Sequence, residues 1–84
     1  MDLVDVAQRL DAEEKLKLKY RYLVRHGAIG EHTEVVREDR LLDVEPEKDV
    51  FFVSFDDRDV IWIKADEAID VLPDDGIYGE TAGH

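Results

Sequence analysis

The sequence predicts an α+β fold, in which a short N-terminal helix is followed by a five-stranded, strongly bent antiparallel sheet or a small SH3-like or Sm-like barrel. Apolar residues recur at helical spacing near the N-terminus, and later segments form alternating patterns or short apolar runs. Short polar turns separate those segments, which is typical of neighbouring antiparallel strands. The helix is expected to close one open end of the sheet.

The helix is expected from Asp2 to Leu10. Leu3, Val6, Ala7 and Leu10 fall at positions i, i+3, i+4 and i+7, which places them on one face. Asp2 is a candidate N-cap. A helix of fewer than about 12 residues is not stable alone in water, so this one must pack on the rest of the chain.

Residues 11–27 allow two interpretations. Apolar residues alternate with lysines and arginines from Leu16 to Val24, which is typical of a half-buried strand. Asp11 and Glu14 instead match the capping box of a helix. A helix would bring like charges together at spacing i, i+4, whereas a strand separates them. We therefore predict a strand with one apolar and one cationic face.

Further strands follow this segment. Residues 33–37 and 41–44 form one bent strand with a bulge, or two short strands interrupted at Glu38 and Asp39. Residues 50–55 and 60–63 are apolar runs on either side of four polar residues, which predicts a β-hairpin. This hairpin contains all three phenylalanines and the only tryptophan, so the core must be built on it.

The C-terminal part is less regular. Residues 65–72 form either a helix, because their apolar residues have helical spacing, or a single turn over 65–67 followed by a last strand over 69–72. No apolar residue recurs at a regular interval afterwards, so we expect a flexible tail over residues 74–84. The globular domain is then expected to span residues 1–73.

Composition restricts the environment and the chemistry. The 84-residue chain has 22 acidic and 11 basic residues, a net charge of −11 and no cysteine, which excludes disulfides and cysteine nucleophiles. This acidic composition resembles that of cytosolic proteins of salt-loving archaea; the alternative is an ordinary acidic protein that binds a basic partner. The acidic start of the chain lacks the basic region of a signal peptide, and no apolar run is long enough for a membrane span. We expect a cytoplasmic protein.

No catalytic residue, cofactor site or metal site is predicted, so we expect a protein that is not an enzyme. Ser54 is the only serine and lies inside an apolar strand without a glycine-rich turn beside it. The sequence contains no phosphate-binding loop and no dinucleotide fingerprint. The acidic loop over residues 56–59 lacks the spacing of a calcium loop, and His26 and His32 match no zinc pattern.

The expected function is that of a non-enzymatic protein-interaction or assembly module. The central hairpin is apolar on both faces, and the rest of this short chain has little left to cover the second face. A homodimer through that face, or another protein partner, is therefore expected. The predicted contact residues are those of the following that stay exposed: Phe51, Val53, Phe55, Trp62 and Tyr20.

A nucleic-acid-binding module is the first alternative. The segment from Lys15 to Arg25 has five positive charges and no negative one, and it contains two tyrosines. On a strand, however, those tyrosines point away from the cationic face, where the basic side chains would pair with neighbouring acids. The residues that would bind phosphate are Lys15, Lys17, Lys19, Arg21 and Arg25.

A small-ligand-sensing regulatory domain is the second alternative. Residues 50–63 followed by 69–72 resemble the closing strands of SH3-like modules, including the ligand-sensing WYL domains of regulators, although Phe51-Phe52-Val53 stands where those domains have Trp-Tyr-Leu. The resemblance implies a small pocket, here lined by Phe52, Trp62 and Tyr22.

Overall fold

The computed structural model describes residues 1–25, 27 and 30–81. It contains a short N-terminal helix followed by an antiparallel sheet, so the predicted fold class is confirmed. A sixth strand, which the sequence did not predict, joins the sheet. The elements in chain order are α1 (Leu3–Asp11), β1 (Leu16–Arg25), β2 (His32–Glu45), β3 (Val50–Phe55), β4 (Asp59–Lys64), the 3₁₀ helix η1 (Ala65–Glu67), β5 (Ala68–Pro73) and β6 (Gly79–Glu80).

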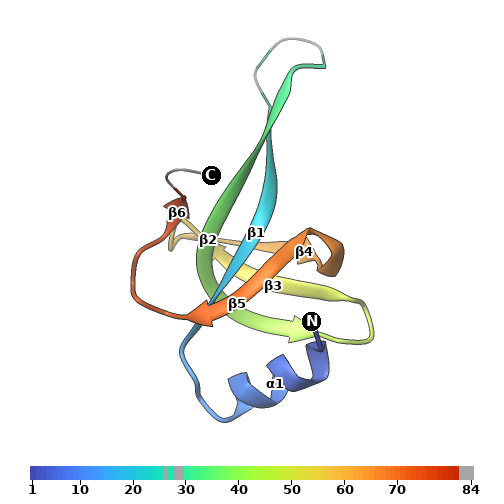
Figure 1. The fold of residues 1–84 in the computed structure, drawn as a ribbon, viewed down its shortest axis with the longest axis vertical. Coiled ribbons are helices and arrows are strands. Elements are labelled where there is room, and N and C mark those ends of the chain that lie inside the picture. The colour runs from blue at the N-terminus through green and yellow to red at the C-terminus, as the bar shows by residue number, and fades with distance from the viewer. Residues whose placement is uncertain (26, 28–29, 82–84) are drawn as a thin grey trace.

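The strands lie in the order β4-β3-β2-β1-β5, and β6 pairs with β2. β4 and β5 are the edges of this sheet, and no ladder between described strands joins them. The molecule measures 43 × 28 × 22 Å, and its long axis follows the β1–β2 hairpin, which extends away from the other strands (Figure 1). α1 lies at the opposite end (Figure 1).

α1 begins where the sequence predicted. The Asp2 carboxylate accepts hydrogen bonds from the backbone amides of Val4 at 3.0 Å and Asp5 at 3.4 Å, which satisfies two amides of the first helical turn. Val6 is buried, and the other members of the apolar stripe pack partly buried against the core. The helix is therefore stabilised by its cap and by packing on the sheet.

Residues 16–25 form a strand, as predicted, and not a helix. Leu16, Leu18 and Tyr20 are buried on the face that contacts the core. Because successive side chains of a strand point to opposite faces, the basic residues of β1 lie on the other face. The free energy gained by burying these three apolar side chains outweighs the helix-capping preference of Asp11 and Glu14.

β2 is one long strand with a bulge, which was one of the two predicted structures. The irregularity lies between Leu41 and Asp43, where Leu42 is the extra residue and is 42% exposed. The chain does not break at Glu38 and Asp39, where the sequence placed the interruption, because the Asp39 side chain is fully buried and hydrogen-bonded.

A buried polar network surrounds Asp39. Its carboxylate accepts hydrogen bonds from the Tyr20 hydroxyl at 2.6 Å, the Arg37 guanidinium at 3.1 and 3.3 Å, and the Asp56 amide at 3.1 Å. Arg37 also pairs with the Asp56 carboxylate, and its guanidinium lies 3.8 Å from the centre of the Phe55 ring. The network thus connects β1, β2 and the β3–β4 turn.

The network changes the acidity of its members. Burial and the hydrogen bond to Asp39 raise the pKa of Tyr20, so this hydroxyl stays protonated in the folded chain. Burial alone would lower the pKa of Arg37, but its hydrogen bonds to Asp39 and Asp56 outweigh that effect and raise it. The guanidinium is therefore charged at every ordinary pH.

Residues 74–81, which belong to the segment predicted to be a flexible tail, lie against the sheet; residues 82–84 fall outside the described part of the chain. Lys17 is only 4% exposed and contacts Asp75 at 2.8 Å, Glu38 at 2.5 Å and the Ile77 carbonyl at 3.1 Å. Further along, the Thr81 amide donates a hydrogen bond to the β2 backbone at 2.9 Å. A buried lysine needs anionic partners, and the C-terminal segment supplies one.

Residues 65–73 adopt the second of the two predicted structures. η1 is a single turn, and β5 then pairs with β1 in antiparallel fashion. The helix is not formed, because the strand places Asp70 beside Lys19 and Val71 beside the buried Leu18.

We predict that Asp39→Ala lowers the free energy of unfolding by about 3–5 kcal/mol, because it leaves the buried Arg37 charge with one carboxylate fewer. Tyr20→Phe removes one hydrogen bond and should cost about 1–2 kcal/mol. Urea denaturation followed by circular dichroism measures both. If Asp39→Ala does not fold, Tyr20→Phe still provides the test.

Asp59→Ala, at an exposed carboxylate that starts β4, is the control and should change stability little. An Asp39→Ala midpoint equal to that of the control would contradict the structural role of the network.

A second prediction concerns acid. The hydrogen bond from Lys17 lowers the pKa of Asp75 below its ordinary value of 3.8. The pKa of Asp75 is lower in the folded chain than in the unfolded chain. The contact with Lys17 therefore stabilises the docked segment fully at pH values above the ordinary pKa of 3.8, and this stabilisation is lost as the pH falls through the lower pKa of the folded chain. The protection factor of the Thr81 amide, which compares its exchange rate with that of an unstructured amide at the same pH, should therefore be high at about pH 6 and fall below about pH 4.

Asp75→Asn should accelerate Thr81 exchange already at about pH 6, where the wild-type carboxylate is ionised. Glu47→Gln, in the exposed β2–β3 turn, is the control and should behave as wild type. Equal exchange in Asp75→Asn and wild type would show that the ion pair does not hold the segment.

Candidate protein-interaction site

The two faces of the β3–β4 hairpin have different environments. Phe51 pairs with Ile63 in the ladder, and Val53 pairs with Ile61; this face forms part of the core. Phe52 pairs with Trp62 on the opposite face. The second face is not covered by α1, since α1 packs on the core face with Val6.

The structure narrows the set of predicted contact residues. Phe51, Val53 and Tyr20 are each 0% exposed, so they are core residues and cannot present a side chain to a partner. Phe55 is half-buried beneath the Arg37 guanidinium. Trp62 alone of the five is well exposed, at 60%. The sequence left Phe51 and Val53 among the candidates because it does not specify which face of the hairpin is turned inward.

An apolar surface nevertheless exists on the hairpin. Val60 is 65% exposed and stands two residues from Trp62 on the same face of β4. The half-buried Phe52 adjoins Trp62 on β3. We name these three residues the β4 apolar surface. Large aromatic side chains at such a surface commonly anchor protein interfaces.

A groove of about 930 Å³ runs along β4 beside this surface. β4 forms one wall, and the outer half of β1, Arg21–Arg25, forms the other. Leu23 of β1 is 50% exposed and adds to the apolar lining. The lining residues are Arg21, Tyr22, Leu23, Arg25, Glu34, Val60, Ile61, Trp62, Ile63, Lys64 and Glu67.

The groove is less acidic than the chain as a whole. It contains three basic and two acidic residues, whereas the whole chain has a net charge of −11. Arg21 is paired with Glu34 at 3.6 Å and Glu67 at 3.5 Å. Arg25 and Lys64 have no ion-pair partner among the described residues. The groove therefore presents two uncommitted positive charges.

The structure does not gather the predicted nucleic-acid-binding residues into one open surface. Lys17 is buried under the C-terminal segment and is bound to Glu38 and Asp75. Burial would lower the pKa of Lys17, but these hydrogen bonds raise it, so the charge is kept and compensated internally. Arg21 is also paired with acids, whereas Lys15 and Arg25 are exposed and Lys19 is half-buried.

The predicted ligand pocket is only partly assembled. Tyr22 and Trp62 both line the β4 groove, but Phe52 does not. The groove is open along its length, and no buried side-chain polar atom of a described residue lacks a partner there or elsewhere. Small-molecule sites usually enclose their ligand and direct a few polar groups into an apolar cavity.

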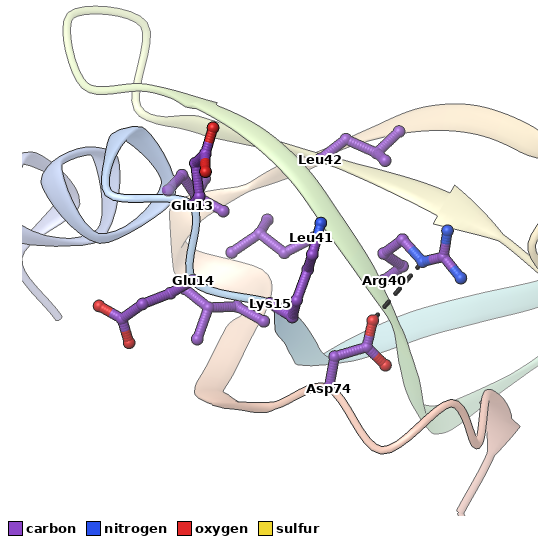
Figure 2. Close-up of a pocket in the computed structure, with 9 residues that line it drawn as sticks. Glu13, Glu14, Lys15, Arg40, Leu41, Leu42 and Asp74 are labelled. Carbon is purple, nitrogen blue, oxygen red and sulfur yellow. Dashed lines mark ion pairs between the residues drawn. The ribbon is translucent and has the colours of Figure 1, made fainter.

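A second hollow, of about 660 Å³, lies between the end of α1 and β2 (Figure 2). Leu41, Leu42 and two further leucines give it an apolar lining, and charged residues stand around it. Figure 2 shows that Arg40 and Asp74 lie on one side, where they form an ion pair at 3.5 Å. Arg40 also contacts Tyr78 and Asp57, so its charge is used within the fold.

Several classes of site have no support in the described part of the chain. No three potential metal-ligating side chains converge there. His26 and His84 lie outside the described residues, so the sequence argument about histidines stays untested. No described helix has the length and apolar character needed to cross a membrane.

Comparisons with protein-family models, curated proteins and solved structures give no match for this chain. The inferences about its function therefore rest on its own residues and geometry.

The sequence missed several groove residues. Val60, Leu23 and Lys64 were not predicted as contacts, although the first two belong to apolar runs. These residues can be recognised as contacts only once the order of the strands is known, because that order decides which strand edge has no neighbour.

We predict that the fluorescence of Trp62, the only tryptophan, is that of an exposed indole. Acrylamide should quench it in the native chain with more than half of the efficiency found in urea, because the side chain is 60% exposed. A blue-shifted emission that acrylamide barely quenches, in dilute solution, would contradict the exposed position of Trp62.

Proposed function

We propose that this chain is a non-enzymatic protein-interaction or assembly module that binds its partner, or a second copy of itself, through the β4 apolar surface. The observation that carries this proposal is the exposure of Trp62 and Val60 on an edge strand. Exposed apolar side chains lose contact with water when a partner covers them, which favours association.

The position on an edge strand strengthens the argument. Natural proteins protect sheet edges by charges, prolines or covering segments, because unpaired backbone groups invite further strands. β4 has charged residues at its two ends, Asp59 and Lys64, but an apolar middle. Such an edge is suited to a partner.

The acidic surface also bears on the partner. A net charge of −11 opposes self-association at low salt, and a high salt concentration screens this repulsion. Contacts built on apolar packing persist under those conditions. An apolar contact surface therefore suits the salt-rich cytoplasm that the composition suggests.

A nucleic-acid function has weaker support. Lys17 and Arg21, two of the five predicted phosphate-binding residues, are paired with acidic side chains within the fold. The tyrosines of β1 lie on the opposite face, where Tyr20 is fully buried. Rings and charges therefore do not form a joint platform for single-stranded nucleic acid.

Light scattering over a concentration series tests the proposal in about 0.15 M and about 2 M KCl. We expect the average mass of the wild type to rise with concentration, and to rise more at the higher salt. In Trp62→Gln/Val60→Thr the dissociation constant should be at least about tenfold weaker, because the apolar contact is lost.

Ile69→Gln/Ile77→Thr is the matched control, since both residues are exposed but lie outside the β4 apolar surface. It should associate as wild type. A wild type that is monomeric at every concentration and salt would exclude self-assembly. Binding of single-stranded RNA that weakens steeply with salt would favour the nucleic-acid alternative.

A further inference from the structure

We propose that the groove between β4 and β1 binds an extended acidic segment of a partner protein, which adds to the sheet as a strand. This inference rests on the proposed function, because it specifies the partner of the same interaction surface. Strand addition to an exposed sheet edge is a common mode of peptide recognition, in which backbone hydrogen bonds give affinity and alternate side chains give specificity.

The β4 wall of the groove is a strand edge and not a strand face. Five consecutive residues, Val60 to Lys64, line the groove. Since neighbouring side chains of a strand point to opposite faces, consecutive residues border one groove only where the strand is seen along its edge.

The backbone of β4 is directed accordingly. The amide of Ala65 donates to the carbonyl of Asp49 at 2.9 Å, and hydrogen-bonded pairs alternate along an antiparallel ladder. Ala65 thus forms a hydrogen-bonded pair with Asp49, and every second residue before it does the same. The backbone groups of Ile63 and Ile61 are therefore the ones that bond to β3. The amide and carbonyl groups of Val60 and Trp62 point to the open side, where a further strand would meet them.

The β1 wall is also an unpaired edge. The ladder between β1 and β5 ends at the pair Tyr20 and Ala68. Beyond this pair, Arg21–Arg25 is paired with β2 on one side only. Both walls of the groove therefore offer unpaired strand backbone.

The two edges match in length. Each exposes five residues, Arg21–Arg25 and Val60–Lys64, and about 17 Å of extended chain covers either one. The sheet is strongly bent, and β4 runs across the direction of the outer half of β1 (Figure 1). An added strand would therefore pair along the β4 edge, and the β1 wall would border its side chains.

The charges at the two ends of the groove select an acidic strand. β4 leads through η1 into β5, whose first residue pairs with Tyr20, so Lys64 lies near the Arg21 end. Arg25 marks the opposite end. Because neither Lys64 nor Arg25 has an ion-pair partner among the described residues, a segment with an acidic residue at each end complements them.

The fold already contains one example of this pairing. β5 pairs with Leu16–Tyr20 along the same edge of β1, where Asp70 lies opposite Lys19 and Val71 lies opposite Leu18. Acidic residues thus meet the cationic face of β1, and apolar residues meet its core face. The incoming segment would continue this pattern beside the outer half of β1, Arg21–Arg25.

The acetylated and amidated pentapeptide Glu-Val-Val-Ile-Glu is a direct probe. It should be titrated into the full chain in about 0.15 M KCl, where long-range repulsion is screened beyond about 8 Å. We expect saturable changes in Trp62 fluorescence and in the backbone amide shifts of Val60, Trp62 and residues 21–25. For so short a strand, a dissociation constant of about 0.1–1 mM is expected.

Two control peptides separate strand addition from other contacts. The same sequence with lysine at both ends should bind about tenfold more weakly, because attraction at Arg25 and Lys64 becomes repulsion. The same sequence N-methylated at both valines keeps its side chains but loses backbone donors, and it should not bind.

Protein variants supply the matching test. Arg25→Glu/Lys64→Glu should weaken binding of the acidic peptide and strengthen binding of the lysine peptide. Lys48→Glu makes the same kind of charge change in the exposed β2–β3 turn and should leave both affinities unchanged. Circular dichroism of each variant confirms that it is folded.

The absence of any shift at about 5 mM peptide would overturn the strand-addition proposal, as would equal binding of the N-methylated peptide. These results would leave the proposed function intact if Trp62→Gln/Val60→Thr still weakens association at least about tenfold. Loss of the acidic preference in the wild type would overturn the assignment of partner charge.

Discussion

The buried carboxylate of Asp39 is the constraint on which the remaining structure depends. A charge that is fully removed from water must have all of its hydrogen bonds satisfied, and Asp39 receives them from Tyr20, Arg37 and the Asp56 backbone. These partners belong to β1, β2 and the β3–β4 turn. The network therefore sets the register of the central strands and holds the turn from which β4 begins.

The position of β4 in turn determines what the surface offers. Once the β3–β4 hairpin is held with Phe51 and Val53 inward, Trp62 and Val60 must point outward. The order of the strands leaves one edge of β4 and one edge of the outer half of β1 without a neighbouring strand. A backbone edge, an apolar side-chain surface and two uncommitted cations consequently meet in one groove, which makes the protein-interaction and strand-addition proposals parts of a single account.

The balance of charge follows a similar logic. Two of the five basic side chains of residues 15–25 are used within the fold, since Lys17 holds the C-terminal segment through Asp75 and Arg21 holds η1 through Glu67. The sequence presented the same residues as an open basic strand. Local charge counts over-predicted a nucleic-acid surface because the acidic partners lie far away in the sequence and are brought close only by folding.

The sequence by itself determined several elements: the capped helix at Asp2, the strand character of residues 16–25 and the central hairpin follow from local apolar patterns and, for the strand, from the spacing of its charges. Tertiary structure alone decided which hairpin face is buried, that Lys17 is covered, and that residues 74–81 pack on the sheet. The physical reason is that local patterns record side-chain spacing. Burial, edge pairing and charge compensation depend on segments that are distant in the chain.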